Sequence, residues 1–308
     1  MAMATETATE VLRKHGRSFY FASHLLSKVH RERASVLYAF CRRVDDIADE
    51  STDPDAALTQ LEAIRASIQD GQAHDQACAP MLALMQQTDM PPDPVVALID
   101  GVASDLKGPD IGTEADLLDY AYRVAGTVGV MMSIVLDVHD PRAWPFAIDL
   151  GIGMQLVNIA RDVGQDARNG RIYLPRQWLG ATEPQAIVAP SDKLAAKLQK
   201  ATRQAVELAN IYFASGTTGI AYLPKGAQGA ILVAAKVYQE IGAVLAQAHY
   251  RSWDRRAVVS LPRKLTCAAA VLTQYTLANR AKQLPAAHDA GLHQSLQGYF
   301  GVDTNIAA

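Results

Sequence analysis

Cysteine and aromatic residues are scarce in this chain of 308 residues. Its three cysteines, Cys41, Cys78 and Cys267, are odd in number and widely spaced, so they do not form the paired framework of a small secreted domain. We expect reduced, buried thiols in a cytosolic protein. Aromatic residues make up only 6% of the chain, while alanine and leucine are abundant. That balance favours helices over sheets.

Long apolar runs and clusters of basic charge are also missing. No uncharged apolar stretch approaches the roughly 18 residues that a transmembrane helix needs, and the polar residues 1–10 lack the apolar core of a secretory signal. The formal net charge is −3, without a run of lysine and arginine. A nucleic-acid-binding protein concentrates such residues on one face. We therefore expect a soluble, cytoplasmic protein with no nucleic-acid partner.

Apolar side chains recur at helical spacing along most of the chain. Within residues 32–50, Leu37, Phe40, Val44 and Ile47 follow one another at three or four positions and form one stripe. Prolines and glycines separate the predicted helices. Helices are expected at 32–50, from 55 onward, at 113–131, 145–166, 191–213, 226–245 and 262–283, with an irregular segment at 171–190.

The connections between these helices are short, and the composition does not shift along the chain. There is no strand-like alternation beyond a few residues, no internal repeat and no Gly/Ser linker. These features predict one all-α domain over residues 1–308. Patterning is weak at both ends, so we expect residues 1–10 and 291–308 to be loosely ordered.

Two acidic segments stand out, and the first lies in residues 41–50. Asp45 and Asp49 are four residues apart, which places them one turn apart on the same face of a helix. Two anions at that spacing destabilise a helix by about a few tenths of a kcal/mol, as like charges one turn apart do. Helix stability alone therefore does not favour the pair, whereas a bound cation would reverse the sign of the interaction.

The second acidic segment repeats the pattern. Asn158, Asp162 and Asp166 form a stripe at four-residue spacing beside an apolar stripe. Arg161 adjoins this segment and Arg42 the first. If the two helices face each other, they line a cleft with oxygens that suit Mg²⁺, and the arginines can fork onto phosphate oxygens. The residues thus predict a site for a metal and an anion, with solvated helix faces as the plainer alternative.

Other motifs fail on detail. A calcium loop at 49–60 would have Pro54 in place of its glycine and Gln60 in place of its bidentate glutamate. The pair Gly151 and Gly153 follows no strand, so close helix packing is a better interpretation than dinucleotide binding. The eight histidines show no HExxH or paired spacing, which argues against zinc.

Five segments in order resemble the phytoene and squalene synthase family: 15–19, 37–49, 122–129, 155–166 and 170–175. They cover most of the chain, and together they are specific. The later stretches 237–242 and 255–260 are more similar to the phytoene synthases than to the squalene branch. One departure is Gln165, where family members often carry glutamate.

The resemblance implies an isoprenoid-synthase fold, a helical bundle around a central cavity. It also implies roles for single residues, numbered here as in this sequence. Asp45, Asp49, Asp162 and Asp166 would bind Mg²⁺, with Mn²⁺ as a substitute, through the substrate diphosphate. Arg42, Arg161, Tyr238 and Arg256 would contact diphosphate, and Arg17, Ser18, Phe19, Tyr38, Tyr122, Gln155 and Asn158 would line the substrate site.

The chemistry that the resemblance implies is a head-to-head condensation. Two geranylgeranyl diphosphates would give a cyclopropyl diphosphate and then phytoene, with release of diphosphate and without NADPH. Two alternatives stay open: a synthase of C30 products from farnesyl diphosphate, and a helical scaffold or assembly factor without activity. Because substrate and product are long hydrocarbons, we also expect peripheral contact with a membrane.

Overall fold

The computed structural model describes residues 7–278 and 286–302, and within them all regular structure is helical. This confirms the predicted all-α class. The longer helices are α1 (Ala8–His15), α2 (Arg17–Ser23), α3 (Lys28–Glu50), α4 (Pro54–Asp70), α5 (Ala79–Thr88), α6 (Pro92–Asp105), α7 (Glu114–Ala121), α8 (Thr127–Val135), α9 (Trp144–Arg168), α12 (Asp192–Thr218), α13 (Lys225–Gln247) and α14 (Leu261–Ala278). Short helices are α10 (Arg176–Leu179) and α11 (Pro184–Val188), and short 3-10 or π segments are η1 (Gln76–Cys78), η2 (Tyr122–Gly126), η3 (Pro141–Ala143), η4 (Gly219–Tyr222) and η5 (Ala290–Leu296).

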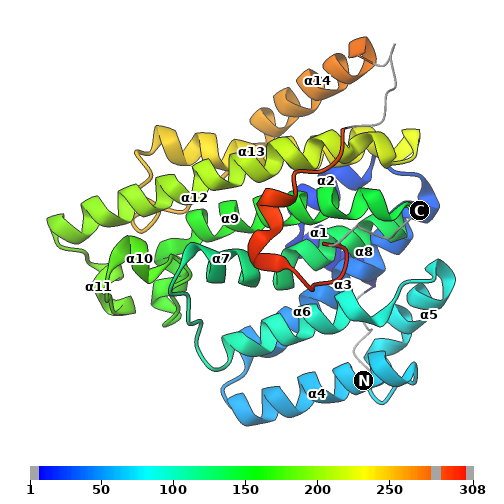
Figure 1. Ribbon diagram of the computed structural model, residues 1–308, viewed down its shortest axis with the longest axis horizontal. Helices are drawn as coiled ribbons and strands as arrows, with labels where there is room; N and C mark the ends of the chain where they lie inside the picture. Colours follow the sequence, from blue (N-terminus) through cyan, green and yellow to red (C-terminus); the bar gives the residue numbers. More distant parts are fainter. Residues whose placement is uncertain (1–6, 279–285, 303–308) are drawn as a thin grey trace.

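Helix α9 lies at the centre of the bundle, between α12, α8 and α13 (Figure 1). Its apolar stripe of Ile152, Leu156, Ile159 and Val163 is buried. The sequence around that stripe is also apolar, which is the composition of a helix covered on most sides. Two helical stretches, Pro141–Arg168 and Lys225–Gln247, are long and apolar enough to cross a membrane, and 72% and 50% of their apolar windows are buried inside the structure.

Helix ends follow the local sequence signals. Thr113 accepts from the backbone of Asp116, whose carboxylate accepts in return, so a capping box opens α7. Ser191 caps α12 with its side chain. Gly170 has a φ of +78°, which suits the turn after α9. The segment 171–190, predicted to be irregular, holds the short helices α10 and α11.

The predicted helix at 113–131 is interrupted by a turn of π-helix, η2 (Tyr122–Gly126). Glycines beside this turn let backbones touch: a Cβ on Gly129 would lie 2.0 Å from the carbonyl oxygen of Ala147, and one on Gly151 would lie 2.1 Å from that of Ala125. The interpretation of Gly151 as a close-packing position is therefore confirmed. This contact holds α8 and η2 directly against α9.

The C-terminal segment differs from the expectation of a loosely ordered tail. Residues 290–302 pack on the bundle: η5 (Ala290–Leu296) lies against α7 (Figure 1, red), and Leu296 and Val302 are buried. The packing of this segment could not be predicted from the sequence, because short 3-10 turns and isolated buried residues do not recur at the spacing of an α-helix. At the N-terminal end, α1 begins at Ala8, within the segment 1–10 that was predicted to be loosely ordered. That prediction stays untested for residues 1–6. Residues 1–6, 279–285 and 303–308 lie outside the described residues, and with them the end expected for the last helix near 283.

Candidate functional site

Five carboxylates from three helices act on one another at one end of the bundle. Burial, then the charge of Asp49, raises the pKa of Asp45 to about 7. Burial, then the charge of Asp162, raises the pKa of Asp166 to about 7. Asp105, at the end of α6, contributes to both shifts, and burial raises its own pKa to about 6. Since charges act in this way only at short range in a protein, α3, α6 and α9 bring these acids together.

Arginines are interleaved with the acids. Arg161 donates to both oxygens of Asp162, at 2.9 and 2.5 Å, and Arg256 donates to Oδ1 of the same carboxylate at 2.7 Å. Arg171 donates to Asp49 at 2.5 Å. Burial alone would raise the pKa of Asp162, but the two guanidinium groups outweigh it and hold that pKa below its ordinary value. The predicted residues Arg161 and Arg256 thus meet on one aspartate.

The acid cluster fits a hard divalent cation. Within the described part of the chain, Asp45 and Asp166 accept no hydrogen bond from a cation, and Oδ1 of Asp105 is buried without a hydrogen-bond partner. Burial, and then neighbouring carboxylates, raise the pKa of all three, so the surrounding protein groups do not fully offset the cost of their negative charge. Carboxylate oxygens are the ligands that Mg²⁺ and Mn²⁺ prefer. The donor set therefore suits a cation held jointly with an anionic ligand.

An apolar cavity of about 320 Å³ opens at this cluster. One end of the cavity is lined by Asp45, Gln155 and Asn158. Phe146, which lies twelve residues before Asn158 on α9, also lines the cavity. At the helical rise of 1.5 Å per residue, that separation is about 18 Å. Most of the other lining side chains are apolar, among them Leu37, Val128, Met132, Leu150, Met154 and Ile231. The cavity is therefore elongated and mostly apolar, and its carboxylate and amide side chains lie at the end near the acids.

Three aromatic rings line the cavity near the acids. The ring of Phe19 lies 5.2 Å from that of Tyr238 and 6.3 Å from that of Tyr38. Burial raises the pKa of each tyrosine to about 12, so both phenols are neutral at physiological pH. Their π faces offer the cavity weak negative potential without a full charge.

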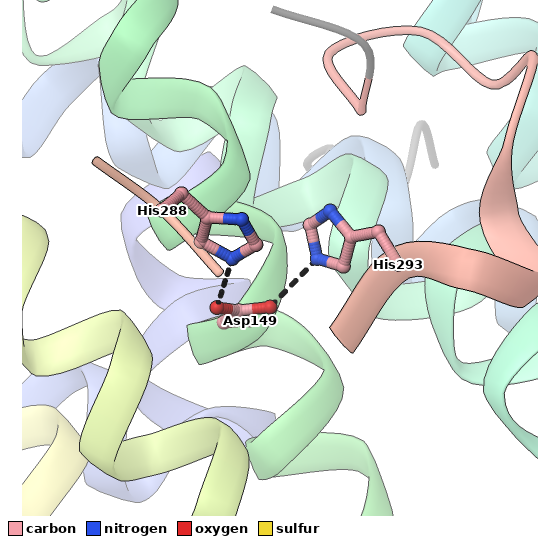
Figure 2. Close-up of side chains that lie close together, drawn as sticks. All are labelled: Asp149, His288 and His293. Carbon is pink, nitrogen blue, oxygen red and sulfur yellow. Dashed lines mark hydrogen bonds and ion pairs between the residues drawn. The ribbon is translucent and has the colours of Figure 1, made fainter. Parts of the chain in front are cut away.

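A second cluster with metal-binding side chains lies away from the acids. Nε2 of His288 and Nε2 of His293 are each 2.7 Å from an oxygen of Asp149, and Figure 2 shows both rings converging on that carboxylate. One ligand atom from each side chain lies within 4.8 Å of the others. Asp149 precedes Asp162 by thirteen residues on α9, about 20 Å along the axis. No spacing in the sequence marks this cluster, because Asp149 lies about 140 residues before the two histidines.

The sequence model of the squalene/phytoene synthase family matches residues 12–263. The chain belongs to this family. A 15-cis-phytoene synthase of Pantoea ananas is 34% identical over 90% of this chain and 94% of its own length. A phytoene synthase of Rhodobacter capsulatus is 34% identical over 94% of this chain and 91% of its own length.

Solved structures support the fold. A dehydrosqualene synthase in complex with a ligand superposes with a TM-score of 0.75 at 26% identity, covering 88% of this chain and 95% of the other. A squalene synthase from Alicyclobacillus acidocaldarius superposes with a TM-score of 0.69 at 24% identity, covering 80% and 94%. The resemblance found in the sequence motifs and the isoprenoid-synthase fold are therefore confirmed.

Most of the residues expected in this family site are brought together. The cavity is lined by six of them: Asp45, Phe19, Tyr38, Gln155, Asn158 and Tyr238. The cluster at its end contains five more: Asp49, Asp162, Asp166, Arg161 and Arg256. Arg42 lies beside the cluster but pairs with Asp46. Arg17 and Ser18 begin α2, and their side chains lie outside the described part of the structure.

Tyr122 is the expected lining residue that the structure places elsewhere. Its ring is 1% exposed, stacks on Tyr299 at 4.6 Å, and its hydroxyl donates to the carbonyl oxygen of Phe300 at 2.9 Å. The side chain thus faces the C-terminal segment, at the position where a π turn interrupts the helix. Tyr122 therefore supports the fold rather than the cavity wall.

Sequence reasoning gave no role to Asp105 or Tyr173, and it placed Arg171 only among the arginines that follow the second acidic segment. The hydroxyl of Tyr120 donates to Asp105 at 2.9 Å, Tyr173 also contributes a hydrogen bond to it, and Arg171 lies close enough to lower its pKa. A single acid at a helix end has no four-residue repeat that could mark it. The only available signal was the apolar helix ending on this acid.

Proposed function

We propose that this chain is a phytoene synthase that joins two geranylgeranyl diphosphates head to head. A cyclopropyl diphosphate would form first and then rearrange to phytoene, with release of diphosphate at each step. The observation that carries the proposal is the long apolar cavity that ends at the clustered aspartates and arginines. The two curated relatives, both named as phytoene synthases, support the same activity.

The acid end would hold the leaving group. Mg²⁺, held by Asp45, Asp49, Asp162 and Asp166 and supported by Asp105, would supply positive charge that stabilises the departing diphosphate. The arginines Arg161, Arg256 and Arg171 now neutralise acids of the cluster. When a cation takes those acids, the guanidinium groups become free to donate to phosphate oxygens.

The cavity would protect the carbocations that follow ionisation. Its apolar lining excludes water, which would otherwise quench them. The faces of Phe19, Tyr38 and Tyr238 can stabilise positive charge by roughly 2 kcal/mol each when desolvated. Because both phenols keep their protons, they do not act as bases here. No reductant is needed, since the final cation loses a proton.

A C30 synthase is the second candidate, and the superposition on a dehydrosqualene synthase favours it. The two activities share the acid cluster and differ in the length of chain that the cavity accepts. A scaffold without activity is disfavoured, since it would not need partly buried acids such as Asp45 and Asp166, to which the described residues supply no hydrogen-bonding cation.

Product analysis tests the proposal. The purified chain is incubated with Mg²⁺ and either geranylgeranyl or farnesyl diphosphate, and the extracted hydrocarbons are identified by mass spectrometry. We expect phytoene from the C20 substrate, with release of inorganic diphosphate that stops on chelation. A C30 hydrocarbon formed in preference would establish the second candidate, and no product from either substrate would overturn both.

We further propose a cytoplasmic location with peripheral membrane contact at the start of α14. Val258, Leu261 and Leu265 are 71%, 62% and 53% exposed there, although all three are large and apolar. Long hydrocarbons must enter and leave, and an exposed apolar patch can lie in the interfacial region of a bilayer. In vesicle flotation, Leu261→Asp with Leu265→Asp should reduce co-flotation; unchanged flotation would move the contact elsewhere.

A further inference from the structure

Two aromatic rings line the end of the cavity far from the acids. Phe146 and Tyr222 both line it, with ring centroids 6.1 Å apart. Gly219 holds Phe146 closely from one side, because a Cβ on that glycine would lie 2.2 Å from the Cβ of Phe146. Phe146 therefore has no room to move toward η4 (Gly219–Tyr222).

His288 closes a second side of Phe146. The two rings meet edge to face, with centroids 5.2 Å apart and planes at 83°. The imidazole belongs to the C-terminal segment and is 8% exposed, so it fills a space inside the protein. A smaller side chain at this position would leave a void next to a ring that lines the cavity.

A hydrogen-bonded clamp fixes the position of His288. Its Nε2 and the Nε2 of His293 each lie 2.7 Å from the fully buried carboxylate of Asp149 (Figure 2). Between the two histidines, the carbonyl oxygen of Leu292 accepts a hydrogen bond of 2.8 Å from Tyr212. The segment is thus attached to α9 and α12 immediately beside the cavity.

The same three side chains could also hold a metal ion, but two features favour the clamp. A closed structural zinc site has four protein ligands, and the described residues provide three here. When one ring nitrogen of an imidazole binds a metal, the N–H of the other ring nitrogen donates a hydrogen bond to a neighbouring acceptor. Nδ1 of His293 is buried and has no partner among the described residues, so this ring lacks the second contact that metal binding would favour.

We propose that His288 is a positioning residue for chain-length selection. Held by Asp149, it fills the space behind Phe146 and so fixes the depth at which the cavity ends. The inference rests on the proposed function, because it takes a prenyl chain to be the ligand that reaches Phe146. Without the imidazole, Phe146 gains room to retreat, and a chain longer by one prenyl unit can then enter.

The test compares C15, C20 and C25 prenyl diphosphates in the wild-type chain and in His288→Ala. We expect the ratio of kcat/KM for C25 over C20 to rise at least about tenfold, the discrimination that one misfitting apolar group provides. The change should come from a lower KM for C25, with kcat for C20 nearly preserved. His288→Gln keeps a donor for Asp149 but removes the ring, so it should shift the ratio in the same way if His288→Ala does not fold.

Two further variants separate positioning from general loosening. His293→Ala breaks the matching hydrogen bond to Asp149 without touching Phe146, so it should lower thermal stability to a similar degree and leave the ratio within about threefold of wild type. His288→Phe restores a ring behind Phe146 and should restore the wild-type ratio. Selectivity that moves equally in His288→Ala and His293→Ala, or in neither, would overturn the inference.

Failure of the proposed function is distinguishable from failure of this inference. If the wild-type chain makes no head-to-head product from any of the three substrates, the function itself is wrong. If the wild-type chain is active but the selectivity of His288→Ala is unchanged, only the positioning role is lost. One equivalent of tightly bound metal in the purified wild-type chain, absent from His293→Ala, would replace the clamp by a metal site and also overturn the inference.

Discussion

The acid cluster and the C-terminal clamp both bury carboxylates on α9, yet their electrostatics are opposite. At the clamp, burial alone would raise the pKa of Asp149, but hydrogen bonds from two histidines outweigh it and the pKa is lowered. At the cluster, the neighbours of Asp45 and Asp166 include further carboxylates, and both pKa values are raised to about 7. An acid whose partners are all supplied by the protein stabilises the fold. Acids left uncompensated indicate a ligand that is supplied from outside.

The largest expected effect of this difference is on turnover. Asp45→Asn or Asp162→Asn should reduce phytoene formation by roughly 10³-fold or more, because each removes a ligand that stabilises the leaving diphosphate. Helical content measured by circular dichroism should stay at the wild-type level. Near-normal activity in either variant would remove that aspartate from the site.

The clamp should show the converse behaviour, a loss of stability. Asp149→Ala leaves two buried imidazoles without their partner, so unfolding free energy should fall by roughly 3 kcal/mol. Urea unfolding of the purified chain measures it, with Asp45→Asn in metal-free buffer as the matched control. We expect the control to be as stable as wild type or more stable. A similar loss in both variants would erase the distinction between the two regions.

The pH dependence of stability sharpens the same comparison. The pKa values of Asp45 and Asp166 are raised in the folded state, so the folded chain binds more protons and the metal-free protein should lose stability as pH rises from about 4 to about 7. Thermal melts in EDTA across this window measure the slope. Asp45→Asn should flatten it and saturating Mg²⁺ with diphosphate should reverse it. A slope that is unaffected by either change would contradict the assignment.

The smallest expected effect concerns Tyr122, which was predicted to line the substrate site but packs against the C-terminal segment instead. Tyr122→Phe removes one hydrogen bond to the C-terminal segment and should cost about 1 kcal/mol of unfolding free energy. Because the ring does not line the cavity, kcat and KM should match wild type. Tyr38→Phe, at a cavity-lining tyrosine, provides the comparison; a kinetic defect in Tyr122→Phe larger than in Tyr38→Phe would return Tyr122 to the site.

The features that could be predicted from the sequence are those whose residues recur at regular spacing along a helix. The apolar stripes of α3 and α9 and the acids at four-residue spacing recur along one helix face, so both the fold class and the four aspartates could be predicted. Asp105 and the Asp149–His288–His293 clamp have no such period, since their members come together only when distant helices pack. Tyr122 was misplaced because no sequence signal marks the π turn that interrupts the helix at its position.

We expect a cation and diphosphate to bind between α3 and α9 rather than at the clamp. Anomalous diffraction from crystals soaked with Mn²⁺ and inorganic diphosphate distinguishes the two places. Anomalous density should appear among Asp45, Asp49, Asp105, Asp162 and Asp166, and none beside Asp149. Density at Asp149, His288 and His293 alone, with the acid cluster empty, would contradict it.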